Sequence, residues 1–209
     1  IDDFYFEAER LDQAMGGNPW GVPRALPGSH DLPLLLQTLS RWKDGEQVDL
    51  PQFDKSLRQG RGDRCGWRSC SAQILLLEGW FVGCQPLPQN TSIELGCEHL
   101  FPSIRSEERD ARAAVQVELR RYEQIWSELD SLWQIAAQDF RSPQIWKRQQ
   151  EQQMLQNTGV ALDSDSLKGF IRMILTAIPP QSFDRIQADV RVEVDPDRRL
   201  RQLRIRQKA

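Results

Sequence analysis

The chain has 209 residues, 39% hydrophobic and 27% charged, a composition typical of a globular domain rather than a disordered or fibrous chain. Its 27 basic and 30 acidic residues give a formal net charge of -3, so no overall positive field would attract nucleic acid or an acidic membrane. The longest apolar runs, 74–77 and 173–175, are far shorter than the ~20 residues that span a bilayer. We therefore expect neither nucleic acid nor a membrane as a main partner.

The chain opens with Ile1-Asp2-Asp3-Phe4-Tyr5, a hydrophobic residue followed by two acids and two aromatic residues. It lacks the basic and apolar regions of a signal peptide. The pattern is typical of the end of a strand that has begun earlier. We therefore expect this sequence to be a fragment of a longer protein.

Turn-forming Gly, Pro and Asn dominate the stretch that follows, up to Asp31. Beyond Asp31, apolar residues recur at helical spacing as far as Trp42, and Pro33 falls in the first turn. This predicts a helix over about 32–43 with Asp31 as a possible cap. Residues 48–53, interrupted by a proline, predict an extended edge segment.

Residues 54–72 contain four Arg, one Lys and three Gly without a hydrophobic period, which predicts a basic, flexible loop. The run that follows, QILLLEGW at 73–80, is continuously apolar until an acid and a glycine end it. That is typical of a buried parallel strand. Glu78 would then stand at the carboxyl end of the strand, the edge where open α/β sheets bind ligands.

The longest periodic segment extends from about residue 106 to 140, where aromatic and apolar residues recur at steps of three and four. We interpret this stripe as core packing. Two more helices are predicted over 143–157 and 163–178, the latter capped by Asp163 or Ser164 and ended before two prolines.

The C-terminal part alternates Val190, Val192 and Val194 in the manner of a strand, and residues 200–205 are expected to return as its partner. Six Arg or Lys between residues 198 and 208 favour a solvated edge strand, with a nucleic-acid arm as the alternative. Strands interleaved with helices indicate an α/β fold with a mostly parallel sheet.

The four cysteines, at positions 65, 70, 84 and 97, contain no C-x-x-C pair, and His30 and His99 lack the spacing of zinc ligands. A reduced intracellular protein is therefore favoured over a zinc site or a disulfide framework.

Two acids at expected strand ends, Asp2 (or its neighbour Asp3) and Glu78, flank the basic loop. Carboxylates can accept a hydroxyl proton or hold Mg²⁺, and clustered cations can neutralise phosphoryl or carboxylate groups. The combination suits phosphoryl transfer to an alcohol. Charged strand ends that serve only solubility remain the alternative.

Several strings occur in a fixed order: IDDFYFEAERLDQ, RALPGSHDLPLLLQTL, LPQFDKSLRQGRGDR, ILLLEGWFVGCQPL, RYEQIWSELDSLW, IWKRQQEQQM and VRVEVDPDRR. Together they resemble the plant and cyanobacterial type of D-glycerate 3-kinase over nearly the whole chain. That family belongs to the P-loop kinases related to uridine kinase, phosphoribulokinase and pantothenate kinase. The resemblance implies one P-loop NTPase-like domain over 1–209, a three-layer α/β/α fold that uses ATP and Mg²⁺.

The resemblance also implies roles for individual residues. Asp2 matches the base that receives the acceptor proton, with Asp3 as the fallback, and Glu78 matches the Walker-B-like acid that acts on Mg²⁺. The acceptor-side motifs match His30, Asp31, Asp54, Lys55 and Arg64. Of these, Lys55 and Arg64 could bind the glycerate carboxylate.

Simpler structural roles stay open for some of these residues. Asp31 could only cap the helix that follows, and His30 could be a packed loop histidine. The IWKRQQE string resembles the lid helix that closes over ATP. There Lys147 and Arg148 follow the Trp, where the family usually has Arg immediately after it. Lys offers the phosphates a point charge without a bidentate fork.

No G-x-x-x-x-G-K-[ST] motif occurs in the 209 residues, so the loop that cradles the β- and γ-phosphates is missing from this sequence. In the resembling family that loop precedes the D-D-F-Y string. We therefore expect an N-terminally truncated kinase whose first strand, phosphate loop and first helix are absent, and which is inactive alone.

The expected activity of the parent protein is transfer of the ATP γ-phosphoryl group to the 3-hydroxyl of D-glycerate, in the cytoplasm or, in a plant or alga, the plastid. One alternative is a related phosphotransferase of the uridine kinase or pantothenate kinase type. Another is a relic without a phosphate loop that serves as a binding module.

Overall fold

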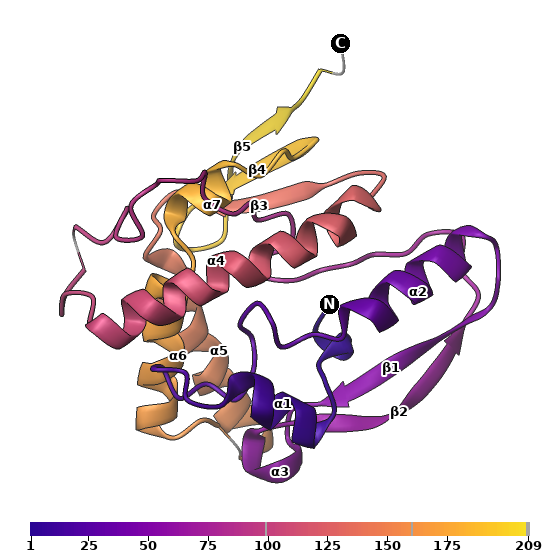
Figure 1. Ribbon diagram of the computed structural model, residues 1–209, viewed down its shortest axis with the longest axis horizontal. Coiled ribbons are helices and arrows are strands. Elements are labelled where there is room, and N and C mark those ends of the chain that lie inside the picture. Colours follow the sequence, from indigo (N-terminus) through magenta and orange to yellow (C-terminus); the bar gives the residue numbers. More distant parts are fainter. Residues whose placement is uncertain (99, 160, 208–209) are drawn as a thin grey trace.

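The computed structural model describes residues 1–98, 100–159 and 161–207 (Figure 1). Its helices are a 3-10 helix (Asp2–Phe4), α1 (Ala8–Met15), α2 (Leu32–Lys43), α3 (Leu57–Gly60), α4 (Ser106–Ser127), α5 (Ser142–Thr158), α6 (Ser164–Thr176) and α7 (Pro180–Asp184). Its strands are β1 (Val48–Asp54), β2 (Asp63–Cys70), β3 (Trp133–Ala137), β4 (Val190–Val194) and β5 (Leu200–Ile205). The predicted α/β class is confirmed, with mixed sheets rather than a mostly parallel one in the described residues.

The strands form two separate sheets in the described residues. β1 and β2 make an antiparallel hairpin, whereas β3 pairs parallel with β4 and β4 pairs antiparallel with β5. In Figure 1 the long helix α4 runs between the hairpin and the three-stranded sheet. α2 contacts both α4 and β1, and so links the hairpin to the centre of the molecule.

The core is centred on one face of α4. Leu119, Tyr122 and Ile125 are all 0% exposed, and burial of side chains of this size contributes ~1.5–3 kcal/mol each. The Tyr122 ring also contacts the rings of His30 and Phe81. Residues before α2 and residues after the hairpin therefore meet on this helix.

The helix α2, whose start is marked by a capping aspartate and a proline in the first turn, forms as predicted. α2 begins at Leu32, and the Asp31 carboxylate accepts a hydrogen bond from the Leu34 nitrogen at 3.3 Å. α5 and α6 also form close to their predicted bounds, with Asp163 as the cap of α6. The N-terminal residues differ from the expected strand end, since Asp2–Phe4 is a 3-10 helix and only Tyr5 makes an isolated bridge, to His30.

The predicted flexible loop over 54–72 is wrong, because residues 63–70 form the strand β2 and residues 57–60 form the short helix α3. Most β2 side chains are exposed or half-buried, so the strand shows no hydrophobic alternation and is held by backbone pairing with β1. Gly62 has a φ of +82°, and a Cβ there would lie 2.3 Å from the Phe53 ring. The turn into β2 therefore requires glycine.

The predicted buried strand over 73–80 is also wrong. No strand of the described chain pairs with these residues, and Ile74 and Leu76 are 77% and 89% exposed. Leu75 and Leu77 pack against the core. The segment therefore buries alternate side chains. An apolar run does not form a strand unless another strand lies beside it to pair with its backbone.

The single long segment predicted over 106–140 is two elements. α4 ends at Ser127, and β3 follows after a short connection. The Leu132 nitrogen donates to the Asp189 carboxylate at 2.9 Å, and the Asp189 nitrogen donates to the Leu132 carbonyl at 2.8 Å. Pairing with β4 therefore overrides the helical spacing of the aromatic residues.

The basic C-terminal segment is the edge strand β5, as predicted, and all of its side chains are exposed. Basic residues on such an edge discourage pairing with a second chain. None of the described helices is both long and apolar enough to cross a membrane. All four cysteines are free thiols.

Candidate functional site

A cleft of about 2590 Å³ lies among the N-terminal segment, residues 73–80, β3 and α5. This volume exceeds the ~300–1,000 Å³ of a pocket for one small molecule. The charged residues in its wall include Asp2, Arg24, Lys55, Glu78 and Lys147.

Asp2 and Glu78 line the same cleft although they are far apart in the sequence. The Ile1 nitrogen donates a hydrogen bond to the Glu78 carbonyl oxygen at 2.7 Å, which brings the two segments together. The Glu78 side chain is exposed and has no hydrogen bond or ion pair within the described residues. A free carboxylate in this place fits a divalent cation held directly or through water.

The Asp2 carboxylate is held by two groups. The Lys55 ammonium donates to Oδ2 at 2.7 Å, and the Tyr5 hydroxyl donates to Oδ1 at 3.0 Å. Burial raises the pKa of Asp2, but the hydrogen bonds and the charge of Lys55 outweigh it and hold the pKa below its ordinary value. Asp2 is therefore ionised at neutral pH and able to accept a proton.

Asp3, the fallback for the base, points elsewhere. It is exposed, it lies outside the cleft wall, and its Oδ1 accepts a hydrogen bond from the Phe53 nitrogen of β1 at 3.3 Å. The geometry therefore favours Asp2 over Asp3 as the group that faces an acceptor.

His30 lies behind Tyr5 rather than in the cleft. It is 2% exposed, its ring stacks on Tyr5 with a centroid distance of 4.4 Å, and its Nδ1 lies 2.8 Å from the Tyr122 hydroxyl. Burial lowers the pKa of His30 to about 3, so the ring is neutral at physiological pH. The structure gives it the packed-histidine geometry, with Tyr5 between it and Asp2.

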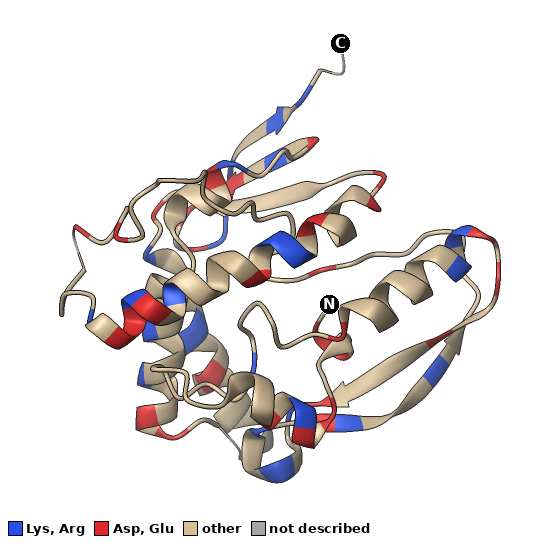
Figure 2. Cartoon of the chain, in the orientation of Figure 1, with Lys and Arg blue, Asp and Glu red and all other residues tan. Residues whose placement is uncertain are grey.

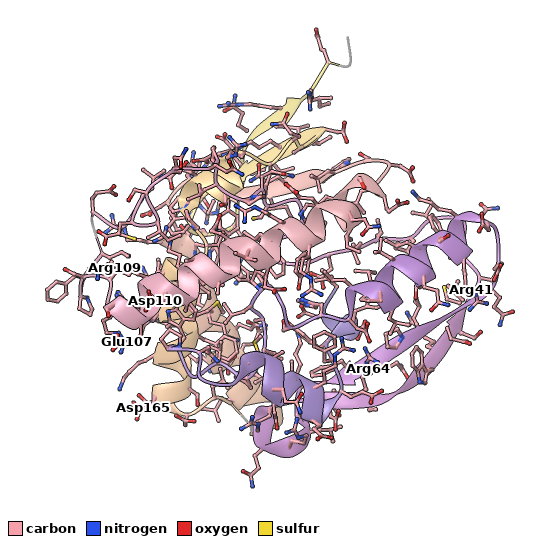
Figure 3. The ribbon with its side chains drawn as sticks, in the orientation of Figure 1. Arg41, Arg64, Glu107, Arg109, Asp110 and Asp165 are labelled. Atoms are coloured by element: carbon pink, nitrogen blue, oxygen red, sulfur yellow. The ribbon has the colours of Figure 1, made fainter. Side chains whose placement is uncertain are left out.

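Arg64, which is labelled in Figure 3, pairs with Asp31 at 3.3 Å. The Arg64 side chain is 11% exposed, and its Nε also donates to the Tyr5 carbonyl at 3.0 Å. Figure 2 shows that this region, near α1, α3 and the adjoining end of β2, mixes acidic and basic residues. Neither Arg64 nor Asp31 lines the cleft; both brace the N-terminal segment.

Asp54 closes a local turn. Its Oδ1 accepts hydrogen bonds from the Ser56 nitrogen at 2.8 Å and the Ser56 hydroxyl at 2.6 Å. This turn presents the neighbouring Lys55 to Asp2. Of the acceptor-side residues that the sequence predicts, only Lys55 therefore reaches the cleft.

The predicted lid residues on α5 diverge from each other. Lys147 lines the cleft and pairs with Glu151 at 2.6 Å, whereas Arg148 is exposed and lies outside the cleft wall. Glu151 also accepts a hydrogen bond from the Leu162 nitrogen at 3.0 Å. Lys147 is therefore the lid cation that already faces the cleft.

Arg24 is a cleft residue that the sequence analysis missed. Its Nη1 donates to the carbonyl oxygens of Gly60 and Arg61 at 2.6 and 3.1 Å. Burial lowers the pKa of Arg24, and the nearby charges of Asp2 and Glu151 partly offset that effect. The only sequence signal is its place at the start of the RALPGSHD string.

No cluster of three or more His, Cys, Asp or Glu suited to a metal ion occurs in the part of the chain that the structure describes. Mg²⁺ in kinases is often held by only one or two carboxylates together with substrate phosphates and water. A Mg²⁺ role for Glu78 is compatible with that pattern.

The chain is similar to several kinases. It is 28% identical over 190 residues to D-glycerate 3-kinase, chloroplastic, of Arabidopsis thaliana, covering 85% of this chain and 39% of that protein. It is 39% identical over 101 residues to a probable ATP-dependent kinase of Saccharomyces cerevisiae, covering 43% of this chain and 35% of that protein. No protein-family model matches it.

A solved structure extends the similarity to the fold. D-glycerate 3-kinase from Cryptococcus neoformans superposes with a TM-score of 0.80 at 26% identity, over 98% of this chain and 78% of that one. The chain is homologous to these ATP-dependent kinases. These comparisons confirm the resemblance to D-glycerate 3-kinases that the sequence indicated. They also confirm the predicted P-loop kinase fold. It spans less than two fifths of the length of the two curated relatives.

Proposed function

We propose that the whole protein transfers the γ-phosphoryl group of ATP to the 3-hydroxyl of D-glycerate. The observation that carries this proposal is the cleft that both the ionised Asp2 carboxylate and the free Glu78 carboxylate line. The names of two homologues, from Arabidopsis and Cryptococcus, support glycerate as the acceptor. The same resemblance suggests a cytoplasmic enzyme, or a plastid one in a plant or alga.

In the proposed reaction Asp2 accepts the proton of the acceptor hydroxyl as its oxygen attacks the γ-phosphorus. Lys55 and Tyr5 hold both carboxylate oxygens of Asp2 and so fix its orientation before the acceptor binds. Glu78 would hold Mg²⁺, which neutralises charge on the phosphates when it is bound. Lys147 would add a positive charge from the lid side of the cleft.

We propose that the loop for the β- and γ-phosphates comes from sequence outside these 209 residues. Two observations support this: the missing Gly-Lys-[Ser/Thr] motif and the small fraction of the relatives' length that the chain spans. The coding sequence upstream of Ile1 tests the proposal. A glycine-rich loop with that motif is expected there; an upstream region without it would favour a binding module.

A coupled assay of ADP release by the full-length protein tests the function. We expect turnover with D-glycerate and Mg²⁺ATP, and little with uridine or pantothenate at the same concentration. Turnover with uridine or pantothenate in place of glycerate would move the protein to a sister activity. No turnover with any of the three would contradict the kinase proposal.

Lys55→Met is expected to move the acid limb of the kcat/KM profile for D-glycerate to higher pH. Lys55 stabilises the ionised form of Asp2, so its removal raises the pKa of Asp2, and the base becomes protonated at a pH where the wild type still works. Rates measured from pH 4.5 to 9 check this. Lys43→Met is the matched control, because Lys43 also lines the cleft but pairs with Glu128 at 2.9 Å. An unmoved acid limb in the Lys55 variant would contradict the pairing.

A further inference from the structure

Arg24 lines the cleft. Within the described residues only its Nη1 is engaged, in two hydrogen bonds to the backbone carbonyls of Gly60 and Arg61. Nε and Nη2 have no hydrogen-bond partner in residues 1–98, 100–159 and 161–207. They are also not among the fully buried polar atoms without a partner, so both are accessible from the cleft. These two donors therefore remain available to a molecule in the cleft.

Arg24 has no acid of its own within the described residues, unlike most of the other cations that line the cleft. Lys55 pairs with Asp2 at 2.7 Å, Arg61 with Asp12 at 2.7 Å, and Lys147 with Glu151 at 2.6 Å. No carboxylate of the described chain lies within 4.0 Å of the Arg24 nitrogens. A half-buried arginine without a carboxylate is a charge that an anionic ligand can neutralise.

The position of Arg24 relates it to the proposed base. Asp2, Tyr5 and Arg24 line the same cleft, and the charge of Asp2 is close enough to act on the pKa of Arg24. A small acceptor bound between them would place a hydroxyl at Asp2 and an anionic group at Arg24. D-glycerate carries both groups on a three-carbon chain.

We propose that Arg24 binds the carboxylate of the acceptor through Nε and Nη2 and thereby selects hydroxy acids over neutral polyols. This inference rests on the proposed function for the identity of the acceptor. Nε and Nη2 lie on one edge of the planar guanidinium, and their two parallel N–H bonds match the two oxygens of a carboxylate.

The cations that the sequence suggested for this role are less suited to it. Lys55 already donates to Asp2, so a carboxylate there would compete with the base. Arg64 lies outside the cleft wall and is shared among Asp31, Glu7 and the Tyr5 carbonyl. Arg24 can accept a carboxylate without breaking any ion pair of the described chain.

The test compares an anionic and a neutral acceptor in the full-length protein, with D-glycerate and glycerol as the pair. Arg24→Gln is expected to raise KM for D-glycerate about 10- to 100-fold while leaving KM for ATP and kcat/KM for glycerol within about twofold. Arg24→Lys keeps the charge without the fork and should fall between the wild type and Arg24→Gln. Arg61→Gln is the control, since Arg61 lines the same cleft but pairs with Asp12.

A merely structural role, through the Gly60 and Arg61 carbonyls, would lower activity with both acceptors equally, and that result would overturn the inference. An unchanged KM for D-glycerate in Arg24→Gln would overturn it as well, with the kinase proposal intact. If the wild type fails to phosphorylate D-glycerate, the proposed function fails, and malonate binding by thermal shift decides the anion site. Stabilisation of the wild type but not of Arg24→Gln supports the site, whereas equal shifts in both reject it.

Discussion

Replacing Asp2 by asparagine is expected to lower kcat of the full-length protein for D-glycerate by about 10²- to 10⁴-fold, the usual contribution of a positioned general base. An asparagine has nearly the same shape and still accepts the hydrogen bond from Tyr5, so the fold should persist. It lacks the negative charge that takes up the hydroxyl proton. KM for ATP should change little, because the substitution lies on the acceptor side. Single-turnover and steady-state phosphoryl transfer measure the effect, with the thermal midpoint as a check on folding.

Asp3→Asn is the matched control for this experiment. It makes the same chemical change one residue away, in a side chain that is exposed and accepts a hydrogen bond from the Phe53 nitrogen. Its kcat should stay within about twofold of the wild type, as expected for a residue outside the chemistry. A large loss in Asp3→Asn with little loss in Asp2→Asn would reverse the assignment of the base.

The sequence predicted helices better than strands, for a physical reason that α2 illustrates. Its start is encoded locally, by Asp31 as a cap and Pro33 in the first turn, and both features appear in the structure. β2 has no such local code. Its partly exposed residues form a strand because β1 offers backbone partners, and that pairing is not visible in the residues of β2 themselves.

The two errors around the cleft have the same origin. The segment 73–80 resembles a buried strand in sequence, yet no described strand pairs with it. Trp133 and Ala136 continue the helical spacing of α4, yet they belong to β3, whose register is set by β4. Periodicity reports which side chains could be buried, whereas long-range pairing decides the backbone.

The site was predicted in part. The strings placed Asp2, Glu78, Lys55 and Lys147, and all of them line the cleft. Residue type alone could not separate Lys55 from Arg64, because both are cations in the same segment; only the fold shows that Arg64 braces the N-terminal segment. Arg24 was missed because its distinctive property is a pair of unused N–H donors. That property depends on the absence of a neighbouring acid in the folded chain, which the sequence does not show.

Arg172→Met is expected to destabilise the protein by about 3–5 kcal/mol, the cost of removing one partner of a buried ion pair. Arg172 on α6 donates from Nε and Nη2 to the two carboxylate oxygens of Glu108 on α4, each at 2.7 Å. The Glu108 side chain is 0% exposed, and although burial raises its pKa, the bonds from Arg172 and Arg105 lower the pKa to about 2. Without Arg172 this buried carboxylate loses its two bonds to α6 and keeps only those from Arg105. Urea unfolding measures the difference.

Two further variants separate the buried charge from the loss of side-chain volume. Lys168→Met lies on the same helix and breaks an exposed pair with Asp165, which Figure 3 shows at the surface, so it should cost no more than about 1 kcal/mol. The double variant Arg172→Met with Glu108→Met should be more stable than Arg172→Met alone, because the cost of the buried, under-paired carboxylate exceeds the bonds that Glu108 still accepts from Arg105. Equal destabilisation of the single and double variants would show that Arg172 acts through its bonds to the Pro102 and Ser103 carbonyls instead. Because Glu108 and Arg172 join α4 to α6, a loss on the predicted scale would mean that this pair fixes the helix that carries the core face.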